Sequence, residues 1–212
     1  RLFVVDSDNS TEEAWESLWP VALKYLKGQE LGFIGAIPLQ NWFQRILLKW
    51  QFTQETTVIL LAWENGKTLV KYEHPVVKIR PMRITDLKSI ETLDEAAFGP
   101  IWHNSLLTLE YAFRQAALAT VAVLDEEIVG YQISTTTQMG GHLARLAVHP
   151  RVQKRGIGTA LVDDLLQQFV RRGAQRVTVN TQKDNLASLA LYRRAGFEQT
   201  GETYPVFRYS GS

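Results

Sequence analysis

The turn at residues 153–160, Gln-Lys-Arg-Gly-Ile-Gly-Thr-Ala, constrains the fold of this chain more than any other feature. It follows residues 142–149, which predict a strand ended by Pro150. After the turn, apolar residues recur at helical spacing from Gly158 to Arg172 and predict a helix. Unpaired N–H groups and a positive macrodipole favour an anion at a helix start, and glycine lets a ligand approach the backbone. The turn therefore predicts a phosphate site on a strand–turn–helix unit.

Two common phosphate motifs do not fit this turn. The P-loop spacing Gly-x-x-x-x-Gly-Lys-Ser/Thr is absent, and the third glycine of the dinucleotide fingerprint would stand where the chain has Leu161. A basic turn with two glycines is also common as a plain connection. A second motif decides between these interpretations.

The second motif lies downstream of the turn. Residues 176–182 alternate β-branched and polar side chains and predict a strand; residues 184–197 predict a short helix capped by Asp184 or Asn185 and stopped by Gly196. Gln-x-x-Gly-x-Gly at a helix start, followed by Asn-x-x-Ser-x-x-Leu-Tyr-x-x-x-Gly-Phe, resembles the GNAT superfamily of acetyl-CoA-dependent N-acyltransferases. The resemblance covers about Val77 to Tyr209.

The resemblance implies an α/β (α+β) GNAT fold, a mixed central sheet flanked by helices, with parallel strands at 142–149 and 176–182 that splay apart. The pantetheine arm of acetyl-CoA would lie in the opening and pair with the first strand, where a backbone N–H would polarise the thioester carbonyl. The pyrophosphate would lie on the N–H groups of 154–159. The expected cofactor-binding residues are Leu146, Ala147, Val148, Gln153, Lys154, Arg155, Gly156, Ile157, Gly158, Thr159 and Asn185.

The resemblance also implies the catalytic roles. Tyr192 would protonate the departing CoA thiolate as a general acid. The general base differs from the family's clearest patterns, because Asn180 and His142 stand where two groups of relatives have glutamate. His142 suits proton transfer at neutral pH; the alternatives are a water held by Asn180 or an amine that arrives neutral. His103, in an aromatic, uncharged loop at 99–104, is a further candidate for the acceptor pocket.

Composition excludes several other classes of function. The net charge of +1 does not suggest a nucleic-acid binder, and the chain has no cysteine for a disulfide, a thiolate nucleophile or a metal site. The four histidines form no metal-binding pair, and no apolar run of 18 residues predicts a membrane span. We expect a cytoplasmic enzyme that needs no metal and contacts neither nucleic acid nor membrane.

Residues 1–76 predict a second, related half. Strands at 2–5, 33–37 and 57–63 alternate with helices at 11–27 and 40–50, the order that also follows Arg145. At an offset of 145 residues, Gly28, Phe52 and Gln54 have identical counterparts. The active residues do not: the glycine turn faces the acidic segment 8–13, and Asn185 and Tyr192 face Gln40 and Leu47.

These patterns predict a partial, degenerate GNAT-like repeat at 1–63, a connector at 64–76 and a catalytic domain at 77–212. The missing front strands and initiator methionine suggest a segment upstream, so the first half would pack on the second domain, on that segment or on another chain, for example in a homodimer. In the second domain we expect a strand at 77–80, helices at 85–98 (capped by Thr85) and 105–117, and a hairpin of 120–124 with 127–136.

The sequence thus predicts an N-acetyltransferase that moves an acetyl group from acetyl-CoA to an unidentified amine by direct attack in a ternary complex. An O-acyltransferase or a longer acyl chain is the alternative within this class. The alternative outside it is a module that binds CoA or acyl-CoA without turnover, for sensing or assembly.

Overall fold

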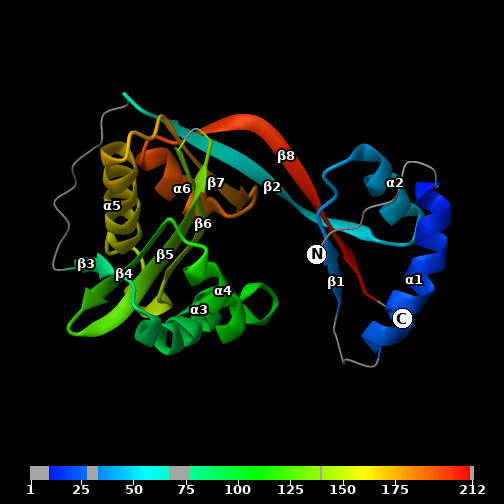
Figure 1. The fold of residues 1–212 in the computed structure, drawn as a ribbon, viewed down its shortest axis with the longest axis horizontal. Helices are drawn as coiled ribbons and strands as arrows, with labels where there is room; N and C mark the ends of the chain where they lie inside the picture. Colours follow the sequence, from blue (N-terminus) through cyan, green and yellow to red (C-terminus); the bar gives the residue numbers. More distant parts are fainter. Residues whose placement is uncertain (1–9, 28–32, 67–76, 139, 211–212) are drawn as a thin grey trace. The chain divides into compact units, whose positions relative to one another are not determined.

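The computed structural model describes residues 10–27, 33–66, 77–138 and 140–210 (Figure 1). The predicted strand at 2–5, Gly28 and most of the connector at 64–76 lie outside these ranges. The elements in chain order are α1 (Thr11–Lys27), β1 (Ile34–Ala36), α2 (Asn41–Lys49), β2 (Thr53–Glu64), β3 (Lys78–Pro81), the 3-10 turn η1 (Ile84–Asp86), α3 (Leu87–Trp102), α4 (Leu106–Arg114), β4 (Leu118–Leu124), β5 (Glu127–Thr137), β6 (Gly140–Val148), η2 (Pro150–Val152), α5 (Ile157–Arg171), β7 (Arg176–Gln182), α6 (Leu186–Arg194) and β8 (Glu198–Tyr209).

The strands form one mixed sheet in the order β1-β8-β2-β7-β6-β5-β4-β3. Antiparallel pairs join β3 to β4, β4 to β5, β5 to β6 and β1 to β8, while β6 and β7 are parallel. The predicted α/β class with a mixed central sheet flanked by helices is confirmed. The chain divides into two compact units: residues 1–58, 182–184 and 203–212 make the first, and residues 59–181 and 185–202 the second.

The core of the second unit lies on both faces of its sheet. Side chains of α3 and α4 pack with β4 and β5 in one cluster, which includes Ile90, Leu109 and Tyr131. Side chains of α5 and α6 pack with β6 and β7 in another, which includes Phe169 and Val177. Each helix pair therefore covers a face of the sheet, as the amphipathic spacing of these segments predicts.

A bulge in β6 changes which residues face each helix layer. Arg145 pairs with Ile133 of β5, but the next pair joins Leu143 to Ser134, so Ala144 is an extra residue. In a regular strand Leu143 and Ala147 would share a face, because side chains alternate with a period of two. The bulge instead leaves Leu143 in the α5–α6 cluster and puts Ala147 in the α3–α4 cluster.

The core of the first unit is aromatic. Trp15 and Trp19 of α1 stack with ring centroids 5.1 Å apart and pack around Phe52, with Leu47 of α2 and Phe207 of β8 in the same cluster. Strand β8 has no counterpart among the predicted elements. Its last residues complete this core, so residues from both ends of the chain bury the apolar face of α1.

Most predicted boundaries are confirmed within a few residues. Helix 11–27 and strand 176–182 have the predicted bounds, and the hairpin of β4 and β5 turns at Asp125 and Glu126, whose positive φ values of 49° and 63° suit a tight two-residue turn. Two other predictions were wrong at their ends: β2 begins at Thr53 rather than at 57, and α4 ends at Arg114 rather than at 117.

The segment from 81 to 105 differs most from its prediction. Thr85 is not a helix cap: it lies inside η1, where the Asp86 carboxylate accepts a hydrogen bond from the Arg83 N–H at 2.7 Å. The predicted loop at 99–104 is also wrong, because α3 continues to Trp102 and leaves only residues 103–105 between the two helices. Gly99 and Pro100 mark a helix end by their intrinsic preferences, but tertiary contacts beyond them override those preferences.

Candidate functional site

Strand β6 has an edge that its parallel neighbour does not use. Its register with β7 runs from Gly140↔Arg176 to Leu143↔Val179 and stops there, although β6 continues to Val148 and β7 to Gln182. On its other side β6 stays paired with β5 as far as Val148. The two parallel strands therefore part in the middle of the sheet, as predicted, and the opening lies beside residues 144–148.

The backbone groups at this edge follow from the antiparallel ladder. The His149 N–H donates to the Val129 carbonyl, at 2.9 Å, so Ala147, two residues earlier, turns its own groups toward Tyr131 of β5. Leu146 and Val148 consequently turn theirs toward the open edge. The Val148 carbonyl accepts a hydrogen bond from the Gln153 side chain at 3.0 Å, which ties the strand to the glycine turn.

The glycine turn brings backbone N–H groups to the start of α5. Lys154 (φ 62°) and Gly156 (φ 80°) both adopt the left-handed region, and Gly156 is the cap residue of the helix. The N–H groups of Ile157, Gly158 and Thr159 fall in the first turn, where a helix offers them no backbone partner. Residues 153–156 are exposed, whereas the side chains of Ile157 and Thr159 are buried, so those two can meet a ligand only through their backbone.

Packing explains Gly158 as well as any ligand does. A Cβ at this position would lie 3.2 Å from Cδ2 of Leu191 in α6 and 3.8 Å from Cγ2 of Val148. The missing side chain thus lets the start of α5 approach α6 and β6 closely. Of the nearby cations, Arg151 is paired with Glu127, so the exposed Lys154 and Arg155 supply the positive charge at the turn.

Helix α6 starts and ends as its motif predicts. Asn185, not Asp184, is the cap: its Oδ1 accepts a hydrogen bond from the Ser188 N–H at 3.1 Å. Gly196 follows the helix with φ 89°, and the Phe197 N–H closes the end on the Tyr192 carbonyl at 2.9 Å. These contacts fix the orientation of the helix that carries Tyr192.

Tyr192 is buried in the α5–α6 cluster, with only 5% of its surface exposed. Its ring lies 5.7 Å from that of Phe197, and no described residue hydrogen-bonds its hydroxyl. Burial raises the pKa of Tyr192 well above its ordinary value. The phenol therefore stays protonated at any pH at which an enzyme works, as a proton donor requires.

His142 lies at the paired end of β6 and β7. Its Nδ1 is 2.9 Å from Oγ1 of Thr178, whose hydroxyl is 3.5 Å from the Gly141 carbonyl. If Thr178 donates to that carbonyl, it accepts the Nδ1 proton, and Nε2 is left as an acceptor. Burial lowers the pKa of His142, so the neutral, basic form is the main one at pH 7. Asn180, the other candidate, is exposed two residues beyond Thr178 on β7.

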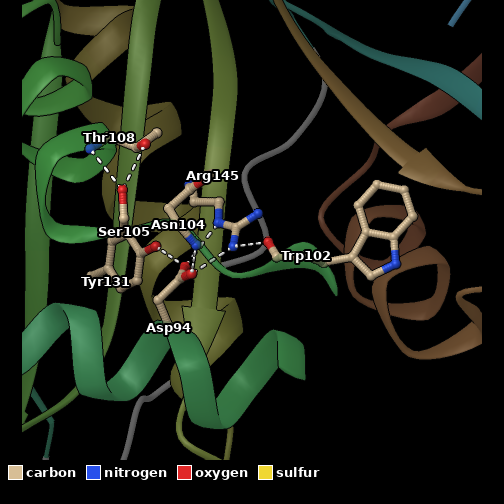
Figure 2. Close-up of polar contacts among 7 residues, drawn as sticks. All are labelled: Asp94, Trp102, Asn104, Ser105, Thr108, Tyr131 and Arg145. Carbon is tan, nitrogen blue, oxygen red and sulfur yellow. Dashed lines mark hydrogen bonds and ion pairs between the residues drawn. The ribbon is translucent and has the colours of Figure 1, made fainter. Parts of the chain in front are cut away.

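A buried cluster of charged groups lies next to β6, and no sequence motif pointed to it (Figure 2). The Asp94 carboxylate on α3 is fully buried and forms an ion pair with Arg145 of β6, at 2.7 Å between Nη2 and Oδ1. Tyr131 of β5 donates its hydroxyl to the same carboxylate, and the Asn104 N–H donates at 2.6 Å. Arg145 also donates to the Trp102 carbonyl at 2.7 Å. The only sequence signal was an arginine among the apolar residues 143–148.

Two residues of the loop predicted at 99–104, Trp102 and His103, are exposed. Trp102 is 40% exposed at the end of α3, and His103 is exposed in the short connection that follows. Among the described residues no group of three or more His, Cys, Asp or Glu could hold a metal ion. Within the same ranges no helix is long and apolar enough to cross a bilayer.

Three solved structures resemble the chain along most of its length or of theirs. A GCN5-related N-acetyltransferase from Sphaerobacter thermophilus (17% identity, TM-score 0.67) matches over 92% of this chain and 68% of its own. A tandem GNAT protein from the clavulanic acid biosynthesis pathway (14%, 0.68) matches over 99% and 74%. The PaiA N-acetyltransferase from Thermoplasma acidophilum in complex with coenzyme A (16%, 0.54) matches over 64% and 99%. At these identities the likeness shows a shared fold.

The sequence itself gives the family. A model of the acetyltransferase (GNAT) family matches residues 87–197, which is more than half of the 212 residues. That range starts with α3 and ends on Phe197, so it contains the buried cluster, the open edge of β6, the glycine turn and Tyr192. The chain belongs to the acetyltransferase (GNAT) family.

Proposed function

We propose that this protein transfers an acetyl group from acetyl-CoA to an amine within a ternary complex. The main support is the course of β6. This strand leaves its parallel neighbour after Leu143 and continues with a free edge to Val148, and η2 then joins it to the glycine turn. A long cofactor with an amide-bearing arm and a phosphate end fits such a path. The CoA complex of the PaiA enzyme, which has the same fold, supports this choice of donor.

The cofactor would bind mainly through backbone groups. We assign the pantetheine amides to Leu146 and Val148, since Ala147 turns its own backbone groups toward β5. The pyrophosphate would accept hydrogen bonds from the first N–H groups of α5 at Ile157, Gly158 and Thr159, with Lys154 and Arg155 beside it. Gln153 would act indirectly, by holding the strand to the turn. Asn185 uses Oδ1 for its cap, so its amide nitrogen is the group that would reach the cofactor.

The chemistry is then a direct transfer. The neutral amine attacks the thioester carbon, and the carbonyl oxygen gains charge that a backbone N–H of the open edge stabilises. When the intermediate collapses, the C–S bond breaks and Tyr192 gives its proton to the sulfur, so that CoA leaves as a thiol. Because β6 and β7 have parted at this level, a side chain from α6 can face a ligand that lies between them.

We propose His142 as the base that receives the proton lost by the amine. Its depressed pKa and its hydrogen bond to Thr178 favour a neutral imidazole with a free Nε2. A water held by the exposed Asn180 remains the alternative route for the same proton. Residues 99–104 include no acidic side chain, which favours an acceptor without a strong requirement for a cationic side chain.

We further propose that residues 1–63 are the remnant of a second GNAT repeat, joined through 64–76 to a catalytic domain at 77–212. In support, α2 and α6 are both nine residues long and begin 145 residues apart, and β2 and β8 are both twelve long with the same separation. A tandem GNAT protein matches 99% of the chain. A cytoplasmic location would suit a cysteine-free enzyme that uses this donor.

Calorimetry with acetyl-CoA and CoA, followed by thiol release over a panel of amines, tests the function. We expect both nucleotides to bind and at least one amine to release thiol. Arg155→Glu should weaken CoA binding by about tenfold, because it puts a negative charge beside the phosphates. Arg171→Glu at the other end of α5 makes the same charge change and should not. No binding of either nucleotide would overturn the proposal; binding without any thiol release would favour a CoA-binding module.

A further inference from the structure

The Asp94 carboxylate has a complete set of hydrogen-bond donors. It accepts from the Asn104 N–H at 2.6 Å, from Arg145 Nε at 2.9 Å and Nη2 at 2.7 Å, and from the Tyr131 hydroxyl. A carboxylate offers about four such positions, so none is left over. The cluster is therefore closed, and it joins α3, β5 and β6 to the segment that follows α3 (Figure 2).

Both charged members of the cluster hold backbone at the end of α3 and just after it. Asp94 accepts the Asn104 N–H, and Arg145 donates to the Trp102 carbonyl while its guanidinium lies 3.5 Å from the centre of the Phe98 ring. The Leu106 N–H, two residues after Asn104, is held separately by Glu91 at 2.8 Å. Residues 102–104 are thus fixed from two elements at once.

The segment needs such anchors because its own sequence supports it poorly. Gly99 favours the unfolded chain, and Pro100 lacks the N–H that would close a helical turn. A buried ion pair, by contrast, is a poor means of stabilising a fold, since apolar residues of the same size often do as well or better. The Asp94–Arg145 pair instead fixes the positions of two backbone groups, the Trp102 carbonyl and the Asn104 N–H.

The place of Arg145 on β6 connects this geometry to the proposed chemistry. Arg145 comes immediately before Leu146, the first residue whose backbone groups reach the open edge, and immediately after the bulge at Ala144. One short stretch of strand therefore presents a backbone edge in one direction and anchors residues 102–104 in the other. A shift of either would change the distance between the thioester and whatever rests on Trp102 and His103.

We propose that Arg145 and Asp94 are positioning residues that hold residues 102–104 as the acceptor-facing wall of the site. This inference rests on the proposed function, because it assigns the wall to the amine rather than to the cofactor. The inference predicts that weakening the cluster impairs use of the amine and leaves the binding of acetyl-CoA intact. A cluster that served only stability would change both equally, through the folded fraction.

The test compares Arg145→Lys with Arg80→Lys. Arg80 forms the same kind of pair elsewhere in the unit: it binds Asp86 through two nitrogens, at 2.7 and 2.9 Å, and Asp86 accepts the Arg83 N–H. Lysine keeps the charge in both variants but loses the two-pronged contact. Kinetics are measured with an alanyl tetrapeptide, spermidine and 2-phenylethylamine, on whichever the wild type acetylates fastest.

For Arg145→Lys we expect kcat/KM for the amine to fall by about ten- to a hundredfold, while the Kd for acetyl-CoA changes less than about twofold. Hydrogen exchange of the Asn104 amide should quicken by about tenfold, and that of Arg83 should not change. Arg80→Lys should show the reverse exchange pattern with unchanged kinetics. Tyr131→Phe, which removes one neutral donor, is the milder variant if Arg145→Lys does not fold, and an amine KM raised about threefold is expected.

The outcomes separate this inference from the proposed function. Wild-type protein that bound no acetyl-CoA, or released no thiol with any of the three amines, would overturn both. Wild-type turnover with an unchanged kcat/KM for the amine in Arg145→Lys would overturn the positioning role alone. So would an equal loss of acetyl-CoA and amine affinity, because it would place the cluster in the fold as a whole.

Discussion

The segments α2–β2 and α6–β8 share their local structure and differ in what they can do. In each, the second residue after a nine-residue helix has a positive φ, Gln51 at 65° and Gly196 at 89°. In each, the next N–H closes the helix on a carbonyl five residues earlier, Phe52 on Leu47 at 3.0 Å and Phe197 on Tyr192 at 2.9 Å. The two segments therefore end their helices with the same backbone conformation and the same closing hydrogen bond.

The difference lies in two side chains on that backbone. Leu47 and Tyr192 are both buried, but only the tyrosine carries a proton to give. Gln40 is the N-cap residue of α2 but makes no hydrogen bond through its side chain, whereas Asn185 caps α6 through its side chain. The helix ends therefore serve packing in both segments. Proton donation depends in addition on a tyrosine, which packing alone does not require.

The largest effect is expected for Tyr192→Phe. Loss of the proton donor should lower turnover by about 100-fold or more. Stability should stay close to that of the wild type, because no described residue hydrogen-bonds the hydroxyl that the change removes. Thiol release and a thermal melt on the same sample check both parts.

Calorimetry with acetyl-CoA is the control for Tyr192→Phe, since the affinity should remain near that of the wild type. Turnover equal to the wild type would remove Tyr192 as the acid and make the two helices alike in function as well as in structure.

Leu47→Ala tests the other helix. Leu47 is fully buried in the aromatic cluster of the first unit, so the truncation should cost about 2–5 kcal/mol of stability. Turnover per folded molecule should not change. Denaturant unfolding gives the first quantity and thiol release at low temperature the second; a loss of turnover beyond the unfolded fraction would give the first unit a part in the reaction.

His142→Ala should change the pH profile rather than abolish activity. Burial lowers the pKa of His142 below 6.5, so the wild-type kcat/KM should fall only at a pH below that value. The variant should lose about tenfold in kcat/KM and lose this acidic limb. His103→Ala, which removes an exposed histidine, is the matched control and should keep the limb.

The lowered pKa of His142 also makes the stability of the folded protein depend on pH. The folded state disfavours the charged imidazole, so the unfolded state binds the extra proton first as the pH falls. Stability from His142 is therefore complete above about pH 6.5 and decreases through the range below it.

In the kinetic test, an acidic limb of kcat/KM that persists in His142→Ala would identify a different base.

The parts of the site that depend on local sequence were predictable. The glycine turn, the cap at Asn185 and the stop at Gly196 are each fixed by residues within one or two turns of the chain, where glycine and asparagine have strong preferences. The family resemblance added the splayed parallel pairing of the strands at 142–149 and 176–182, which local preferences do not contain.

The parts that depend on distant contacts were not predictable. Asp94 and Arg145 are 51 residues apart, and nothing near either one indicates the pair. The predicted helix end was also wrong: α3 continues past Gly99 and Pro100 to Trp102, whose carbonyl accepts a hydrogen bond from Arg145. Strand β8 was missed since its apolar residues are few, and they are buried by α1 and α2, at the other end of the chain.

The smallest effects are expected where the two helices differ only in the residue with positive φ. A side chain in the left-handed region costs roughly 1–2 kcal/mol, so Gly196→Ala should destabilise the protein by about that much. Gln51→Gly removes the same strain, but glycine gains about 0.5–1 kcal/mol of freedom in the unfolded state, so the net stabilisation should be at most about 1 kcal/mol. Denaturant midpoints measure both. Opposite signs would show that the two backbones share one constraint; a destabilising Gln51→Gly would mean that the Gln51 side chain makes contacts worth more than its strain.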